Sequence, residues 1–230
     1  MSKNLIKHIA SYFYPQNIFA RSILYELKRK DGIHVIIDAP CGNGETSFHL
    51  SKIKNAKVFA YDISETSINN AKNHFAAKNL FFESCDILNV FEKIQQCDVF
   101  CLINSFFLLP KQELILSSIH KILNKDGLLM MILPNIVAKN YVHFLKHETN
   151  KTVNNFLLGK KDFTSYFNKN GFQVKKEKGI IYTHYYGRKD TQWLSVFSHF
   201  YLTFLNSIQS VLKINEPNYY LLVLNKSEAA

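Results

Sequence analysis

Three aspartates, each following an apolar run, give the first indication of chemistry in this sequence. They are Asp38, Asp62 and Asp86. If the runs are parallel strands, all three carboxylates lie at the carboxyl edge of one sheet, where open α/β sheets bind ligands. An acidic side chain after the second strand can accept hydrogen bonds from both hydroxyls of a ribose, and one after the third can meet an adenine amine. The alternative for Asp62 and Asp86 is an ordinary role as helix caps and turn formers.

The segment after Asp38 has the composition of a ligand-binding loop. Residues 35–50 read VIIDAPCGNGETSFHL, so that Gly42 and Gly44 lie between a buried strand and a helix. Glycines let the backbone approach a ligand closely, and the start of a helix offers unpaired amides. Ser47 stands where the dinucleotide fingerprint G-x-G-x-x-G requires its third glycine, so that fingerprint is incomplete.

Three histidines are candidates for a general base, because histidine titrates near neutral pH. His143 and His147 lie four residues apart on one face of a probable helix, and His184 lies among tyrosines after a strand. The alternative is that each is an ordinary surface or half-buried histidine. Metal ligation at 143 and 147 would need more than the neighbouring Glu148, so no metal is predicted.

The elements that must position these residues alternate between strand and helix. Continuous runs of Val, Ile, Leu and Phe are typical of strands buried on both faces, and their alternation with helices predicts a parallel sheet with right-handed crossovers. We expect strands at 33–38, 57–61, 80–83, 98–103, 128–133, 172–182 and 218–225. Helices are expected at 3–30 with a break at Pro15, and at 45–53, 64–78, 89–95, 111–123 and 162–170. Pro110 is expected to open the helix at 111–123, and residues 124–127 are expected to form a turn after it.

Charge and cysteine usage bound the function classes. The chain has 28 Lys+Arg against 18 Asp+Glu, a net charge of +10, which favours a nucleic-acid partner. Only three of these basic residues are arginines, the residue that grips phosphate with a bidentate fork, so this argument is weak. Four cysteines without a CxxC pair, and the lack of a signal peptide, predict a reducing cytoplasmic compartment.

With these residues in place, the chain resembles the class I S-adenosylmethionine-dependent methyltransferases. The segment DAPCGNG resembles the first motif of that family, Asp62 matches the ribose-binding acid, and Asp86 with Ile87 matches the adenine-contacting position. The segments CDVFCLINSFFLLP and LNKDGLLMMILPN match the fourth motif and the fifth strand. The resemblance implies a Rossmann-like, doubly wound α/β fold, with a seven-stranded, mostly parallel sheet, an antiparallel last strand and helices on both faces.

The resemblance also implies the cofactor, S-adenosyl-L-methionine, and the residues that bind it. These are Asp38, Ala39, Pro40, Cys41, Gly42, Gly44, Asp62, Ile63, Asp86, Ile87 and Asn104. Pro40 departs from the usual glycine but suits a strand that leaves for a turn. Asn104 and Ser105 are followed by Phe106 instead of the histidine that some relatives carry, so no general base is carried over from that position.

The nature of the acceptor follows only by elimination. The Asn-Pro-Pro-aromatic turn of base-amino methyltransferases, the cysteine beside a proline of cytosine-carbon enzymes and the glutamate pair of protein arginine enzymes are all missing. We therefore expect methyl transfer to oxygen or nitrogen of a small-molecule or lipid-linked acceptor. The alternatives are an RNA methyltransferase and a non-catalytic S-adenosylmethionine- or nucleotide-binding module.

We expect one domain over residues 1–230. It would consist of an N-terminal helical cap (1–30), a cofactor-binding core (31–134), a substrate-side helical segment (135–170) and a helical insertion (187–216). Residues 192–212 carry no formal charge and have apolar positions at helical spacing. They predict a helix packed on the sheet or in a homodimer, with a border to an apolar acceptor pocket or peripheral membrane contact as the alternative.

Overall fold

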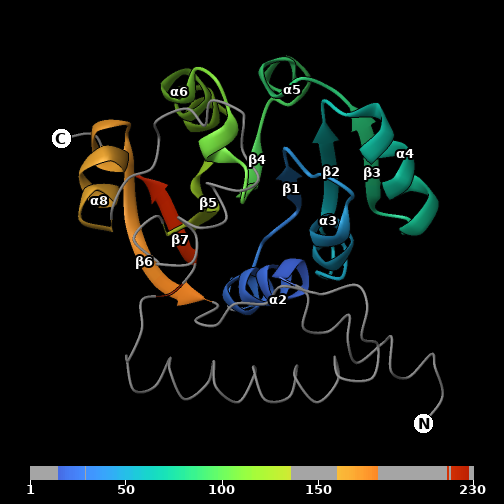
Figure 1. Ribbon diagram of the computed structural model, residues 1–230, viewed down its shortest axis with the longest axis horizontal. Helices are drawn as coiled ribbons and strands as arrows, with labels where there is room; N and C mark the ends of the chain where they lie inside the picture. Colours follow the sequence, from blue (N-terminus) through green and yellow to red (C-terminus); the bar gives the residue numbers. More distant parts are fainter. Residues whose placement is uncertain (1–14, 29, 136–159, 181–216, 218, 228–230) are drawn as a thin grey trace, which may run out of the picture.

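The computed structural model of this protein describes residues 15–28, 30–135, 160–180, 217 and 219–227. Its strands form one sheet in the order β3-β2-β1-β4-β5-β7-β6 (Figure 1). The first five strands are parallel, and β7 runs antiparallel to β5 and β6. The predicted Rossmann-like fold and its antiparallel last strand are confirmed. The strands are β1 (Val35–Asp38), β2 (Lys57–Asp62), β3 (Leu80–Ser84), β4 (Cys97–Ile103), β5 (Leu123–Pro134), β6 (Phe172–Ile180) and β7 (Tyr219–Lys226).

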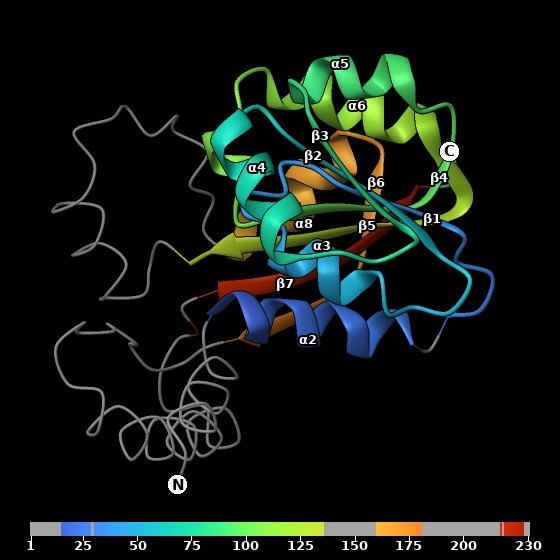
Figure 2. The ribbon, with the colours of Figure 1, turned by 90° about the vertical axis from the view of Figure 1, so that its right-hand side faces the viewer.

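Helices cover both faces of the sheet (Figures 1 and 2). One face carries α2, α3 and α4, and the other carries α5, α6 and α8. These elements are α2 (Pro15–Leu27), α3 (Glu45–Leu50), α4 (Glu65–His74), α5 (Ile87–Lys93), the 3₁₀ turn η1 (Phe106–Leu108), α6 (Gln112–Ile122) and α8 (Lys160–Lys169). Gly171, with a φ of +81°, follows the end of α8 as expected for a C-terminal glycine.

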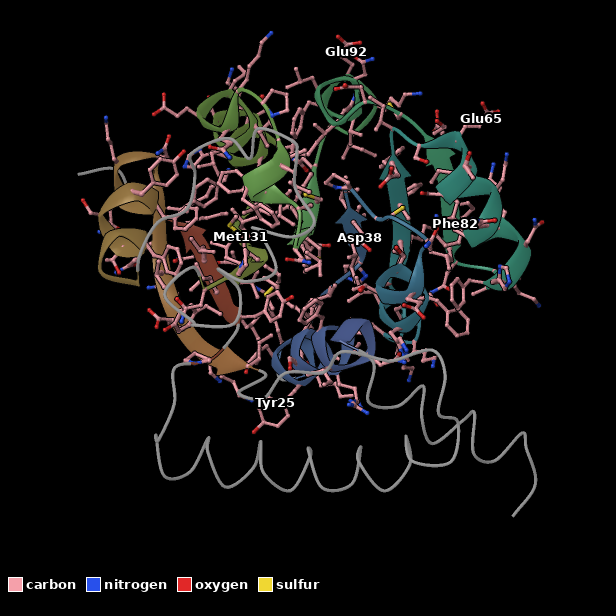
Figure 3. All side chains as sticks on the ribbon, viewed as in Figure 1. Tyr25, Asp38, Glu65, Phe82, Glu92 and Met131 are labelled. Atoms are coloured by element: carbon pink, nitrogen blue, oxygen red, sulfur yellow. The ribbon has the colours of Figure 1, made fainter. Side chains whose placement is uncertain are left out.

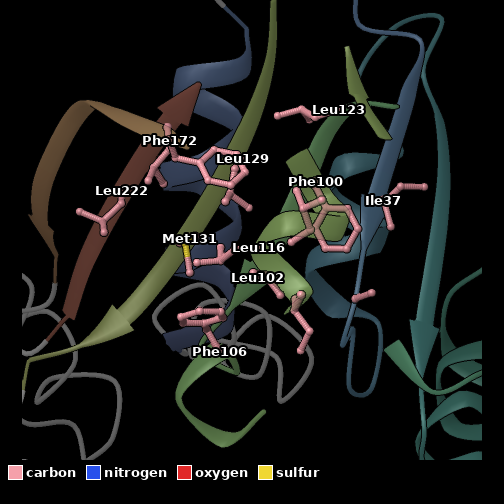
Figure 4. Close-up of a cluster of buried hydrophobic side chains, with 14 of the residues drawn as sticks. Ile37, Phe100, Leu102, Phe106, Leu116, Leu123, Leu129, Met131, Phe172 and Leu222 are labelled. Carbon is pink, nitrogen blue, oxygen red and sulfur yellow. The ribbon is translucent and has the colours of Figure 1, made fainter. Parts of the chain in front are cut away.

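Alternate residues of the central strands supply two separate cores, because successive side chains of a strand point to opposite faces. Phe100 and Leu102 of β4 meet Met131 of β5 and Leu116 of α6 in the core shown in Figure 4. The other core packs Ile36 and the remaining inward residues of the strands against α2 and α3. The near-continuous apolar runs in the sequence reflect this two-sided burial.

The structure corrects two element boundaries at the start and end of α6. Pro110 was expected in its first turn, but the helix begins at Gln112 after Lys111, whose φ of 52° is left-handed. The expected turn at 124–127 lies inside β5. The strand pairs Leu123 with Cys97 and then Leu128 with Val99, so the intervening residues bulge out of the ladder.

Asp98 holds this bulge and the start of the sheet together. Its Oδ1 accepts a hydrogen bond from the Asn124 side chain at 2.7 Å, and its Oδ2 accepts from the amides of His34 and Val35 at 2.8 and 2.9 Å. One carboxylate therefore joins the first residues of β1, β4 and β5. These hydrogen bonds hold the three strands together at their amino ends, opposite the carboxyl ends at which the site lies.

Several predicted segments lie wholly or mostly outside the described residues. They include most of the expected substrate-side segment, the 187–216 insertion with its uncharged helix, and the first half of the N-terminal cap. Among the helices that the structure describes, none is long and apolar enough to cross a membrane.

Candidate functional site

A cavity of about 380 Å³ opens at the carboxyl ends of β1 and β4. β1 and β4 are neighbours in the sheet, and the chain continues from them toward opposite edges, so the cavity lies at the topological switch point where α/β sheets bind ligands. Its volume is within the range of small-molecule sites. The lining residues are Phe19, Asp38, Pro40, Cys41, Gly42, Asn43, Gly44, Glu45, Thr46, Asp62, Ile103, Asn104, Ser105, Leu108 and Leu109.

Asp38 lines the cavity and is only 1% exposed. Figure 3 shows its place beside β1 near the middle of the molecule. Its Oδ2 accepts a 2.6 Å hydrogen bond from the Ser47 hydroxyl, whereas its buried Oδ1 has no partner. Burial raises the pKa of Asp38 to about 7, against the lowering effect of Ser47 and with a smaller upward contribution from Asp62. Ser47, which breaks the dinucleotide fingerprint, thus has a role of its own in orienting the carboxylate.

Asp62 fastens the loop between β1 and α3 to the end of β2. Its Oδ2 accepts the amide of Gly42 at 2.8 Å, and its Oδ1 accepts the amide of Ser64 at 2.9 Å. The Cys41 amide also donates to the Tyr61 carbonyl at 2.8 Å. Because a carboxylate offers about four lone-pair positions, Asp62 retains room to accept hydrogen bonds from a ligand.

The two glycines of the loop serve different purposes, although the sequence predicted the same purpose for both, which is close approach of the backbone to a ligand. Gly42 has a φ of +54°, and a Cβ there would meet no atom within 4 Å, so its backbone faces open space in the cavity. Gly44 has a φ of +81°, and a Cβ there would lie 2.6 Å from the Phe82 ring and 2.8 Å from Ala71. Gly44 therefore allows α3 to pack closely against β3 and α4, whereas the space beside Gly42 is open to a ligand.

The end of β4 contributes two further unpaired polar atoms. Asn104 has a left-handed φ of 52°, and its amide donates to the Ile132 carbonyl at 2.9 Å. The Asn104 Oδ1 and the Ser105 Oγ are buried without a hydrogen-bond partner. Together with the Asp38 Oδ1 they line a cavity that can take a group donating several hydrogen bonds, such as an ammonium.

The structure brings only some of the predicted cofactor residues to this cavity. Ala39, Ile63, Asp86 and Ile87 are not among its lining residues. Ile63, beside Asp62, is 71% exposed, which is unusual for a large apolar side chain. Asp86 caps α5 by accepting the Leu88 amide at 2.8 Å, and this cap explains why α5 begins at Ile87, two residues before the expected start.

Several lining residues were missed in the sequence. Phe19 comes from α2, far away in the sequence, and only the packing of α2 on the sheet reveals it. Glu45, Thr46 and Ser105 directly adjoin the two motifs, so proximity to those motifs was an available signal. Leu108 follows the fourth motif and is 58% exposed at the cavity.

Among the described residues, neither the end of β4 nor Cys41 in the loop after β1 supplies a general base. Asn104 and Ser105 lack titratable side chains, and burial raises the pKa of the Cys41 thiol, which keeps it protonated. The predicted base candidates His143, His147 and His184 lie outside the described residues. Within the described part of the chain, no cluster of three metal-binding side chains occurs.

Comparison with known proteins identifies the family. The methyltransferase domain family matches residues 30–171, more than half of the chain. The chain belongs to this methyltransferase family. S-adenosylmethionine is the cofactor that this membership implies, and the unpaired acceptors and the open backbone at Gly42 fit it. Among curated proteins, none matches the sequence.

Solved structures of methyltransferases share this fold at low sequence identity. An S-adenosylmethionine-dependent methyltransferase from Archaeoglobus fulgidus has a TM-score of 0.64 and 13% identity, over 94% of this chain and 96% of that one. The plantazolicin methyltransferase BpumL, in complex with S-adenosylhomocysteine, has a TM-score of 0.61 and 18% identity, over 98% and 90%. Magnesium protoporphyrin IX methyltransferase from Synechocystis, also with S-adenosylhomocysteine, has a TM-score of 0.59 and 13% identity, over 92% and 83%.

Proposed function

We propose that this methyltransferase transfers a methyl group to oxygen or nitrogen of a small-molecule or lipid-linked acceptor. The supporting observation is the cavity at the ends of β1 and β4, which is lined both by buried, unpaired polar atoms and by the apolar residues Phe19, Leu108 and Leu109. Two methyltransferases of the same fold act on plantazolicin and on magnesium protoporphyrin IX, which are small molecules. An RNA acceptor is disfavoured, because the proline turn of base-amino methyltransferases and the cysteine beside a proline of cytosine-carbon enzymes are missing from the sequence.

The cofactor residues have distinct proposed roles. Asp38, Asn104 and Ser105 would accept hydrogen bonds from the ammonium of S-adenosylmethionine, and Asp62 would bind the ribose hydroxyls. Ile63 would cover one face of the adenine, next to Asp86 and Ile87. Bound there, the cofactor supplies an electrophilic methyl group on a sulfonium.

The contribution of the protein to the reaction is positioning. Aligning a nucleophile with a methyl group can lower a barrier by about 7–11 kcal/mol. A base is needed in addition where the acceptor is a hydroxyl of high pKa. His143, His147 and His184 stay as predictions for this role, as do the peripheral membrane contact and the homodimer.

Calorimetric titration tests the proposed cofactor site. S-adenosylmethionine and S-adenosylhomocysteine are titrated into the wild type and into Asp62→Ala, with NAD as the control ligand. We expect micromolar binding of both sulfur compounds, no binding of NAD, and at least about tenfold weaker binding by the variant, since charged hydrogen bonds are lost. Unchanged affinity in a folded Asp62→Ala protein would contradict the ribose assignment.

A further inference from the structure

Strand β3 forms one edge of the sheet, and among the described residues no strand pairs with its outer side (Figure 1). In a parallel pair, every second residue of a strand directs its backbone groups toward the neighbouring strand. Just after β3, the Cys85 amide donates to the Asp62 carbonyl of β2 at 2.9 Å. By this alternation, Leu80, Phe82 and Ser84 direct their backbone groups away from β2, toward the outer edge.

The two edges of this sheet differ in their protection against pairing with another chain. Exposed edge strands associate unless charges, prolines or bulges prevent it, and lysine is the charge most often used. Strand β6, at the other edge, has a bulge between Val174 and Lys176 and carries three lysines. Strand β3 has the sequence LFFES, without lysine or proline, and it pairs with β2 in an unbroken register. The sheet thus protects one edge and leaves the other open to a further strand.

The open edge also presents apolar surface. Phe81 is 47% exposed, although its ring stacks on that of Phe59 with centroids 5.2 Å apart. Phe59 in turn lines a hollow of about 650 Å³ together with Val35 and Ile94. A partner seated on the β3 edge would remove the Phe81 ring from water, which stabilises association.

The free backbone groups of β3 are complementary to themselves. The Leu80 amide already donates to the Ala77 carbonyl at 3.1 Å, so Leu80 offers only its carbonyl to the outside. Phe82 offers both its amide and its carbonyl, and Ser84 offers its amide. In an antiparallel copy centred on Phe82, the two Phe82 residues would exchange both hydrogen bonds, and the Ser84 amide of each copy would donate to the Leu80 carbonyl of the other.

The charges that flank β3 favour the same antiparallel arrangement. Lys78 precedes the strand and is exposed, without a hydrogen bond or an ion pair in the described part of the chain, and Asp86 follows the strand. An antiparallel copy centred on Phe82 would bring the lysine at the start of one strand toward the aspartate at the end of the other, at both ends of the interface. A parallel copy would bring like charges together, which is unfavourable.

We propose that β3 is the docking surface for a second copy of this chain, which pairs with it in an antiparallel register centred on Phe82. The two sheets would then join into one across a twofold axis, with the same surface contributed by both copies. No residue of β3 lines the cavity at the ends of β1 and β4, so this surface lies outside the proposed cofactor site and does not depend on it.

Sedimentation velocity over a range of protein concentrations tests whether the wild type dimerises through this edge. We expect twice the monomer mass at micromolar concentrations. Phe81→Glu should raise the dissociation constant of the dimer at least about tenfold, because the new carboxylate would lie opposite Glu83 of the second copy. The control is Leu114→Glu, which places the same charge on a leucine of α6 that is 50% exposed, and it should leave the dimer intact.

A second pair of variants tests the backbone pairing separately from the apolar contact. Ser84→Pro removes an amide that the second copy requires, while an outward-facing position of an edge strand tolerates proline in the monomer. We expect it to raise the dissociation constant at least about tenfold. Ser84→Ala keeps the amide and should dimerise like the wild type. Circular dichroism confirms that each variant is folded.

A cysteine cross-link tests the register. Only the residue on the twofold axis meets its own counterpart, at about 5.5 Å between Cα atoms, which is a distance that a disulfide can bridge. We therefore expect Phe82→Cys to form a covalent dimer under mild oxidation. Ser84→Cys is the control, because its counterpart would lie about 13 Å away along the strands. The wild type, whose four cysteines are free, shows the background of cross-linking.

Three results would overturn the proposal. One is a wild type that stays monomeric; if its Phe82 and Ser84 amides are also protected from hydrogen exchange, another part of this chain covers the edge. The second is a dimer that survives both Phe81→Glu and Ser84→Pro in folded protein, which would place the contact elsewhere. The third is cross-linking by Ser84→Cys but not by Phe82→Cys, which would refute the register.

Discussion

At the scale of single residues, the buried carboxylate of Asp38 determines how the site responds to pH. Its pKa in the folded protein is about 7, above the ordinary value of 3.8, because the charged form is desolvated. The folded protein thus keeps this proton at a pH where the unfolded chain has lost it. The contribution of this proton to the free energy of unfolding is therefore fully present below about pH 4. It decreases by up to about 4 kcal/mol as the pH rises to 7.

This linkage predicts that affinity for S-adenosylhomocysteine rises with pH. An ammonium beside Asp38 favours the carboxylate, so binding must displace a proton below the pKa. We expect the dissociation constant to fall about tenfold or less for each pH unit between pH 5.5 and 7. Calorimetry at pH 5.5, 6.5 and 7.5 measures it. Asp38→Asn is the control, because it should bind weakly with little pH dependence; a pH-independent wild type would refute the role of Asp38.

The Asp38 example also shows what the sequence revealed at this scale. The position of Asp38 at the end of an apolar run was enough to predict an acid at the ligand-binding edge of the sheet, whereas its burial is a finding of the structure. Its unpaired Oδ1, and the Ser47 hydroxyl on its Oδ2, depend on how α3 packs beneath it. For Asp86 the sequence left two roles open, and the structure shows the helix cap.

At the scale of elements, the close packing of α3 on β3 and α4 depends on one missing side chain. Gly44 leaves no space for a Cβ, because the Phe82 ring and Ala71 would lie within 3 Å of it. Its φ of +81° adds strain for any L-residue. The first loop therefore has its shape imposed by neighbouring elements and not by a ligand alone.

Gly44→Ala and Gly42→Ala should consequently behave differently. We expect Gly44→Ala to lower the free energy of unfolding by about 2–4 kcal/mol, from overpacking and backbone strain. Gly42→Ala should cost about 1–2 kcal/mol, from strain alone, and should weaken cofactor binding by crowding the cavity. Urea unfolding and titration with S-adenosylhomocysteine measure both effects. Equal losses of stability would contradict the packing role of Gly44.

At the scale of the whole molecule, α2 completes a fold that the family match does not cover. The match begins at residue 30, yet α2 buries Phe19, Ile23 and Leu27 against the sheet. Phe19 also lies edge-on to Tyr219 of β7, with ring centroids 4.9 Å apart, and lines the cavity. Helix α2 thereby links β7, the last strand along the chain, to the site (Figure 2).

Two alanine substitutions in α2 should separate packing from ligand binding. Phe19→Ala and Ile23→Ala should each lower the free energy of unfolding by about 2–5 kcal/mol, because both side chains are fully buried. Only Phe19→Ala should also weaken S-adenosylhomocysteine binding, since Ile23 does not line the cavity. Unfolding in urea and calorimetry at a temperature where both variants are folded test this. Equal binding by the two variants would show that α2 has no direct part in the site.

The sequence by itself determined which strands of this protein are followed by residues that can contact a ligand. Runs such as KVFAYD predict a buried strand and the acid that ends it, because two-sided burial requires continuous apolar residues and ligand-facing groups can only follow them. The first loop and its glycines were visible for the same local reason. Helix starts were less visible where a single residue decided them: the Asp86 side chain caps α5, and Lys111 precedes α6 in a left-handed conformation.

Tertiary structure alone decided which of these residues share one cavity and what charge surrounds them. Phe19 and Leu108 are 89 positions apart in the chain, and only the packing of α2 beside the end of β4 makes them neighbours of one ligand site. The gathering of the Asp38, Glu45 and Asp62 carboxylates at one cavity of a basic protein likewise cannot be read from composition, because net charge sums over the chain whereas a ligand responds to the few groups within hydrogen-bonding reach. Local patterns fix elements, but the contacts between distant segments decide what those elements can bind.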